Sequence, residues 1–198
     1  MDQTGKPLKK IMDQNSKNSK YWTGFYSNKL VTLKPSPFAI SCLPYIKKGS
    51  TLIDVGCGNG RDSSFFASSG VNVLSIDQSF PRNSFTGNCF FLNSDVDNMP
   101  NIKCDYIYAR FFIHAIPLEK EIKFLNYIKN NCNEFFIEAR SDKSEFEGDH
   151  YRRFINLQQL KDRLDSHGFN YDIEESKDLA ATDTENPFII RVFGRNYD

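Results

Sequence analysis

Residues 51–70 read TLIDVGCGNGRDSSFFASSG, an apolar run that leads into glycines at every second position and then into a mixed segment. The first five residues predict a buried strand, and the segment after the glycines predicts a helix over about 60–69 that ends at Gly70. A glycine-rich turn between a strand and a helix lets a ligand approach bare backbone amides. This stretch therefore predicts a strand, turn and helix unit with a ligand at the turn.

The rest of the chain continues the alternation of strands and helices. The segment 78–88, QSFPRNSFTGN, is rich in turn formers and predicts a loop. Alternating strands and helices favour an α/β fold, a doubly wound and mainly parallel sheet with helices on both faces. The further predicted strands cover 71–77, 89–93, 104–109, 134–139, 171–175 and 188–194, and the further helices cover 36–45, 117–130 and 156–167.

Composition limits the class of protein. The 198 residues carry 25 basic and 25 acidic side chains, so the chain has no net charge. It therefore lacks the excess of positive charge that favours binding to a nucleic acid. The five cysteines are scattered and include no C-x-x-C pair, which is typical of reduced thiols in the cytoplasm. No signal peptide or membrane span is predicted. We expect a mobile tail over 1–20 and one domain over 21–198.

Acidic residues follow two of the predicted strands near the glycine turn. The spacing G-x-G-x-G differs from the dinucleotide motif, because Arg61 stands where a third small residue is needed. Ligands of doubly wound sheets bind at the carboxyl ends of the strands. Asp77 at the end of its strand can accept hydrogen bonds from ribose hydroxyls, and Asp95 can accept one from an adenine amine. Alternatively, Asp77 is a surface strand end and Asp95 is a turn former or helix cap.

Four stretches together resemble a known family. LIDVGCGNGRDSSFFASSG, VNVLSID, NSDVDNMP and DYIYARFFIHAI are similar, in this order, to the motifs of class I S-adenosylmethionine-dependent methyltransferases. YWTGFYSNK and PSPF, which precede them, resemble the small bacterial tellurite-resistance and thiopurine methyltransferases. The resemblance implies a Rossmann-like sheet of seven strands with the last one antiparallel, S-adenosylmethionine as cofactor, and residues 21–46 as an N-terminal lid over it.

The resemblance also implies which residues hold the cofactor. The aromatic side chains near the start of the chain have the alternative of being plain core residues. The implied positions are Asp54 and Gly56 at the methionine part, Gly58 for backbone approach, Asp77 at the ribose, Asp95 and Val96 at the adenine, Arg61 and Arg110 at the cofactor carboxylate, and Tyr21 and Trp22 in the lid.

His114 is the candidate catalytic residue. It lies in ARFFIHAI after the fourth strand, and in the family this loop faces the transferred methyl group. Histidine titrates near neutral pH and can take the proton of a hydroxyl acceptor. An acceptor that is already ionised needs no base. The alternative is a structural histidine that forms a hydrogen bond with a loop carbonyl.

The loop over 141–155 is the predicted acceptor loop. Adjacent arginines beside histidine and tyrosine suit a phosphate or carboxylate, because guanidinium groups form paired, charge-assisted hydrogen bonds. The alternative is a solvated charged lid whose arginines pair with nearby acids. No metal is predicted, because Ala109 and Arg110 stand where metal-dependent relatives place carboxylates. The predicted acceptor-binding residues are Tyr26, Arg140, His150, Tyr151, Arg152 and Arg153.

These residues favour a cytoplasmic small-molecule methyltransferase, either a monomer or a homodimer. DHYRRF is similar to a stretch in methyltransferases of bacterial surface-polysaccharide synthesis, which implies an oxygen of a phosphorylated, nucleotide-linked or sugar precursor as acceptor. The alternatives are a detoxifying methyltransferase for thiol, tellurite or selenite, a nucleic-acid or protein methyltransferase, and a cofactor-binding module without catalysis.

Overall fold

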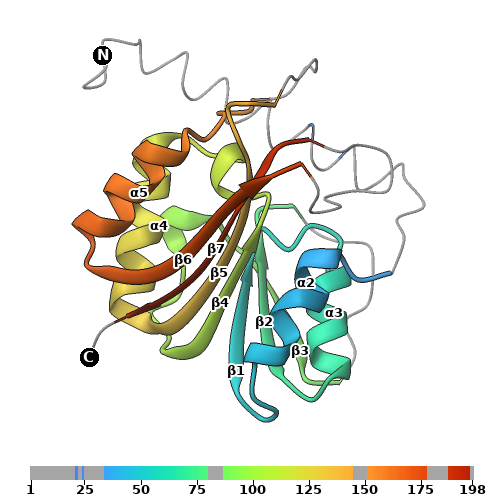
Figure 1. Ribbon diagram of the computed structural model, residues 1–198. Coiled ribbons are helices and arrows are strands. Elements are labelled where there is room, and N and C mark those ends of the chain that lie inside the picture. The colour runs from blue at the N-terminus through green and yellow to red at the C-terminus, as the bar shows by residue number, and fades with distance from the viewer. Residues whose placement is uncertain are drawn as a thin grey trace.

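A single seven-stranded sheet forms the centre of the computed structural model, with strand order β3-β2-β1-β4-β5-β7-β6 (Figure 1). The strands are β1 (Thr51–Val55), β2 (Asn72–Asp77), β3 (Cys89–Asn93), β4 (Cys104–Arg110), β5 (Cys132–Arg140), β6 (Phe169–Ser176) and β7 (Ile189–Asn196). The structure describes Tyr21, Gly24 and residues 34–79, 87–144, 151–177 and 187–196.

The strand directions confirm the expected fold class. β1 runs parallel to β2 and β4, β2 to β3, and β4 to β5. β7 runs antiparallel to both of its neighbours, β5 and β6. The sheet is therefore mainly parallel with the last strand of the chain reversed.

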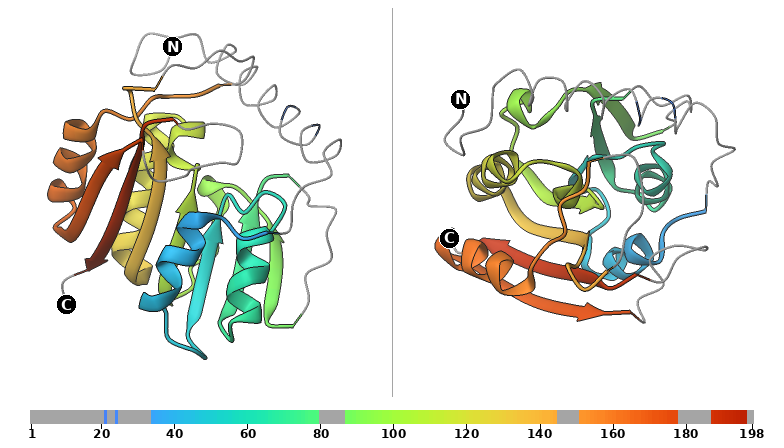
Figure 2. Two further views of the ribbon diagram at one scale, coloured as in Figure 1. Left: turned by 45° about the vertical axis from the view of Figure 1, so that its right-hand side comes forward. Right: turned by 90° about the horizontal axis from the view of Figure 1, so that it is seen from above.

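Helices cover both faces of the sheet, as Figures 1 and 2 show. α2 and α3 lie on one face, and α4 and α5 lie on the other. Ser36 and Asn156 begin two of the helices, and each accepts a hydrogen bond from a first-turn N–H, at 3.1 Å in both cases. The helices are α2 (Pro37–Cys42), α3 (Arg61–Ser68), α4 (Leu118–Asn131) and α5 (Leu157–Ser166), with short 3-10 helices η1 (Leu43–Tyr45), η2 (Val96–Asn98) and η3 (Ile113–Ala115).

Two apolar cores result from the alternation of side chains along the buried strands. Leu52 belongs to the cluster on the α2 and α3 face, together with Phe38 and Phe66. Ile53, the next residue, belongs to the cluster that contains Phe124 of α4. Successive strand residues point to opposite faces, so a parallel strand covered on both sides is apolar throughout. This is why TLIDV contains a single ionisable residue.

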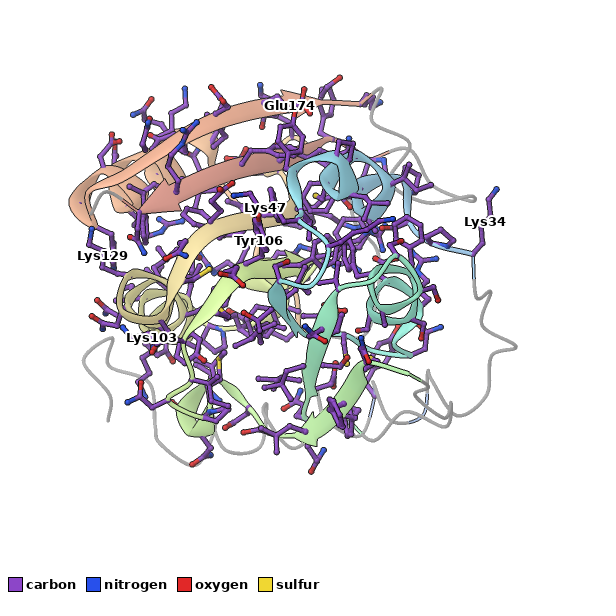
Figure 3. The ribbon with its side chains drawn as sticks, turned by 90° about the horizontal axis from the view of Figure 1, so that it is seen from below. Lys34, Lys47, Lys103, Tyr106, Lys129 and Glu174 are labelled. Carbon is purple, nitrogen blue, oxygen red and sulfur yellow. The ribbon has the colours of Figure 1, made fainter. Side chains whose placement is uncertain are left out.

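The carboxyl ends of the parallel strands lie at the upper edge in Figure 1, and the candidate site is built there. The loop after β1 and the turn η3 after β4 both belong to this edge. At the opposite end, seen in Figure 3, a hollow of about 330 Å³ is lined by residues that include Lys103 and Lys129. In the described part of the chain, no helix combines the length and apolar character needed to cross a membrane.

Several expectations fall outside the described residues. They are the tail over 1–20, residues 80–86 of the predicted second loop, and most of the lid over 21–46 before Lys34. The division into tail, lid, domain and acceptor loop therefore stays a prediction.

Candidate cofactor and acceptor site

The loop after β1 consists of glycines in a conformation that other residues rarely adopt. Gly56, Gly58 and Gly60 have φ values of 74°, 56° and 74°. The backbone N–H groups of Gly56 and Cys57 both donate to the carbonyl of Ile76, at 2.8 and 3.2 Å. A side chain at Gly56 would also meet the ring of Phe112 at 2.7 Å. The glycines are thus required by backbone geometry, and the loop is fixed against β2.

Asp77 connects the end of β2 to this loop. Its carboxylate accepts hydrogen bonds from Gly58 N at 2.9 Å and from Ser79 N at 2.8 Å. Burial raises the pKa of Asp77, and these hydrogen bonds oppose the rise. The backbone N–H of Gln78 is a third donor to Asp77. A carboxylate offers about four acceptor positions, so one remains for a hydroxyl of a ribose. The residues present therefore fit an adenosine held between the two strand ends.

Asp54 lies deep in the sheet under the glycine loop. Its side chain is 2% exposed and accepts a hydrogen bond from Ser63 Oγ at 2.5 Å. Burial raises the pKa of Asp54 to about 8, the Ser63 hydroxyl opposes the rise, and the nearby Asp62 and Asp77 add to it. Burial beside two other carboxyl groups thus favours the protonated, uncharged form of Asp54 under the loop.

Asp62 lies next to the predicted site residue Arg61, and sequence reasoning did not single it out. Its carboxylate accepts hydrogen bonds from Ser36 N at 2.7 Å, Ser36 Oγ at 2.8 Å and Tyr108 OH at 2.9 Å. Arg61, predicted to meet the cofactor carboxylate, lies 3.7 Å from the same group. The contacts fix the start of α2 to the first turn of α3. An acid is favourable in the first turn of any helix, so its position alone carried no signal.

Asp95 and Val96, the predicted adenine residues, lie at the start of η2. The carboxylate of Asp95 accepts from Asn98 Nδ2 at 2.8 Å and from Lys120 Nζ at 3.1 Å. Partial burial acts to raise the pKa of Asp95, but the hydrogen bonds from Lys120 and Asn98 lower it overall. Val96 packs against the core beside α4. α4 therefore sets the position of both residues.

A buried ionic cluster crosses three neighbouring strands. Glu138 of β5 is 0% exposed and accepts from Arg110 Nε and Arg191 Nε, both at 2.8 Å. Arg110 and Arg191 are the register partners of Glu138 on β4 and β7. Arg110, predicted to meet the cofactor carboxylate, is thus oriented by Glu138 at the carboxyl end of β4.

His114 lies in η3 with 3% of its surface exposed. Its Nδ1 accepts a hydrogen bond from Arg140 N at 3.1 Å, and its carbonyl accepts one from Arg153 N at 2.7 Å. A neutral imidazole whose Nδ1 is an acceptor carries its proton on Nε2. In this tautomer, the ring can donate a hydrogen bond from Nε2. Its predicted role as a base remains a proposal.

The acceptor loop is described at both ends, and Arg140, 7% exposed, directly precedes it as the last residue of β5. Tyr151 and Arg152 are partly buried, and burial raises the pKa of Tyr151. Arg153 donates from its guanidinium to the fully buried Glu121 of α4, and to the carbonyl of Ile113 at 3.3 Å. These contacts hold the returning segment on η3.

Three predicted residues cannot be placed. Trp22, Tyr26 and His150 lie outside the described part of the chain, whereas Tyr21 is described and partly buried. Among the residues with described positions, no group of three or more His, Cys, Asp or Glu side chains is arranged to hold a metal ion.

Comparisons with known proteins agree with this geometry. Residues 36–174 match the family described as methyltransferase domain. A search of the curated proteins found no significant match. The fold is similar to that of Burkholderia thailandensis 1,6-didemethyltoxoflavin-N1-methyltransferase, solved with 1,6-didemethyltoxoflavin and S-adenosylhomocysteine, with a TM-score of 0.70 and 14% identity over 95% of this chain and 88% of that one.

Two further solved structures share the fold. Magnesium protoporphyrin IX methyltransferase from Synechocystis PCC 6803, with bound SAH, has a TM-score of 0.63 and 13% identity over 98% of this chain and 89% of that one. The [4+2]-cyclase SpnF has a TM-score of 0.61 and 16% identity over 77% of this chain and 76% of that one. Because the family match spans the glycine loop and every parallel strand, this protein belongs to the methyltransferase-domain family and is a class I methyltransferase with S-adenosylmethionine as its cofactor.

Proposed function

We propose that this methyltransferase acts on a small acidic molecule that enters beside η3 and the acceptor loop. The observation that carries the proposal is that the end of β5 meets the ring of His114 at the carboxyl end of the sheet, through the 3.1 Å hydrogen bond from the backbone N–H of Arg140 to His114 Nδ1. Arg152 and Tyr151 follow within the same loop. Guanidinium groups recognise phosphates and carboxylates through paired hydrogen bonds.

The cofactor supplies a methyl group that is already activated on a positively charged sulfur. The task of this chain is then to hold the reacting atoms in line, an effect worth about 7–11 kcal/mol in favourable cases. Asp77 would hold the ribose, Gly56 and Gly58 would offer bare backbone, and Asp54 would lie under the methionine part. These roles fit a loop and a carboxylate that are joined by a 2.9 Å hydrogen bond.

The tautomer of His114 bears on the class of acceptor. Removing a hydroxyl proton at Nδ1 would break the hydrogen bond from Arg140 N, and Nε2 already carries a proton in the neutral ring. This favours an acceptor atom that is ionised before it binds, such as a carboxylate or phosphate oxygen or a thiolate. Deprotonation of a sugar hydroxyl by His114 is the competing mechanism.

The first acceptors to test are sugar phosphates and nucleotide sugars, which the resemblance of DHYRRF to surface-polysaccharide enzymes supports. The neighbour solved with 1,6-didemethyltoxoflavin shows that this fold can accommodate a small-molecule acceptor. Thiols, tellurite, selenite and bulk RNA are the alternatives that the same screen should contain.

Two measurements test the proposal. Calorimetry should show binding of S-adenosylmethionine and S-adenosylhomocysteine by the wild type, and loss of both in Asp77→Ala. A radiolabel transfer screen over these acceptors should then show methylation of an acidic small molecule, with Asp77→Ala as the inactive control. Exclusive labelling of RNA or protein would overturn the acceptor assignment. Tight cofactor binding without any transfer would favour a different activity on this fold, as the [4+2]-cyclase neighbour illustrates.

A further inference from the structure

Phe111 has an unusual backbone conformation at the centre of the candidate site. It directly follows β4 and is the single non-glycine residue with positive φ, 55°, among the described positions. A bulky side chain is unfavourable in this left-handed region, and such strain persists where the surrounding structure enforces it. Here the backbone N–H of Phe111 donates to the carbonyl of Glu138 at 2.7 Å. The strained residue is thus fixed to β5.

The ring of Phe111 contacts three residues that the sequence assigned to the site. The guanidinium carbon of Arg110 lies 4.2 Å from the ring centroid, and that of Arg140 lies 5.6 Å from it. The imidazole of His114 lies 5.3 Å away, centroid to centroid. These residues come from the end of β4, the end of β5 and η3, so one aromatic ring joins three separate segments.

An aromatic ring suits this position better than an aliphatic side chain of similar size. Two guanidinium groups repel each other, and the negative electrostatic potential over the ring face attracts both. Arg110 is also held independently by Glu138, at 2.8 Å. Loss of the ring would therefore remove a contact of both Arg140 and His114, while Glu138 would still hold Arg110.

We propose that Phe111 is a positioning residue for the methyl acceptor, and that its ring sets the placement of Arg140 and His114. The inference rests on the proposed function, because it assumes that these two residues face the acceptor. Glycine would satisfy the backbone at this position without strain but would lack the ring. The chain therefore retains a strained phenylalanine for its effect on the neighbouring side chains.

The first test separates the backbone from the ring by measuring thermal stability. Both Phe111→Ala and Phe111→Gly remove the ring, but only glycine relieves the left-handed strain. The melting temperature of the glycine variant should lie about 2–4 °C above that of the alanine variant. An alanine variant as stable as the glycine variant would show that the residue is unstrained and would overturn the premise.

The second test separates electrostatics from packing. Phe111→Tyr keeps the aromatic face, whereas Phe111→Leu keeps apolar bulk alone. With the acceptor found in the transfer screen, kcat/KM should stay within about threefold of wild type for tyrosine and fall about tenfold for leucine. The dissociation constant for S-adenosylhomocysteine should change less than threefold in both. Equal kcat/KM for leucine and wild type would overturn the proposal.

A third readout needs no acceptor and keeps the inference separate from the proposed function. In NMR spectra of nitrogen-15-labelled protein, the side-chain Nε–H signal of Arg140, assigned with Arg140→Lys, should keep its position in Phe111→Tyr. In Phe111→Leu, the signal should shift away from its wild-type position. An unchanged signal in the leucine variant would refute the positioning role even if no acceptor is found. A changed signal without any methyl transfer would count against the proposed function alone.

Discussion

Replacing Asp54 with asparagine should change how stability depends on pH. Burial raises the pKa of Asp54 from 3.8 to about 8, so between these values the folded protein holds a proton that the unfolded chain has released. Stability in the wild type is therefore lost as pH rises through this window, by about 1.4 kcal/mol per pH unit. Asp54→Asn has no such proton, and its amide oxygen can still accept from Ser63 Oγ.

The difference in unfolding free energy, variant minus wild type, should rise by roughly 2 kcal/mol between pH 6 and pH 8. Urea denaturation of both proteins at several pH values measures it. Ser63→Ala is the matched control, because the Ser63 hydroxyl lowers the pKa of Asp54, and its removal should move the window to higher pH. A difference that is constant over this range, or that falls with pH, would refute the burial argument.

Three further changes test other parts of the site. Glu138→Gln removes the charge of a carboxylate whose oxygens lie 2.8 Å from the Nε atoms of Arg110 and Arg191. The melting temperature measured by calorimetry should therefore fall by roughly 10 °C. A fall of less than about 2 °C would contradict this. Arg152→Ala should raise the acceptor KM about tenfold and leave cofactor affinity unchanged; the reverse pattern would remove Arg152 from the acceptor site. His114→Ala should lower kcat by less than tenfold if the acceptor is already ionised, and by 100-fold or more if it is a hydroxyl.

Local sequence patterns predicted the elements well, because strand and helix periodicity depends on neighbours in the chain. The strands over 51–55 and 89–93 match the structure residue for residue. β5 begins two residues before its predicted start of 134. The predicted helix ends at 130 and the predicted strand begins at 134, whereas α4 passes into β5 without an intervening loop.

The glycine loop and the carboxylate at the end of β2 could also be found from the sequence. The backbone at Gly56 has a positive φ, which favours glycine. The position of Asp77 beside the glycine loop follows from the rule that parallel strands present their carboxyl ends at one edge of the sheet. Such features depend on the chain within a few residues or on topology alone.

The partners of the site residues were decided only by tertiary structure. Asp62 binds Ser36, 26 positions away, and Tyr108, 46 positions away, while Arg110 meets Glu138 after 28 residues. No periodicity specifies such contacts, because they depend on how strands and helices pack. The left-handed backbone of Phe111 belongs to this class as well. The sequence by itself determined the fold and the edge of the sheet at which the cofactor site is predicted, whereas packing between distant segments determined which side chains meet there.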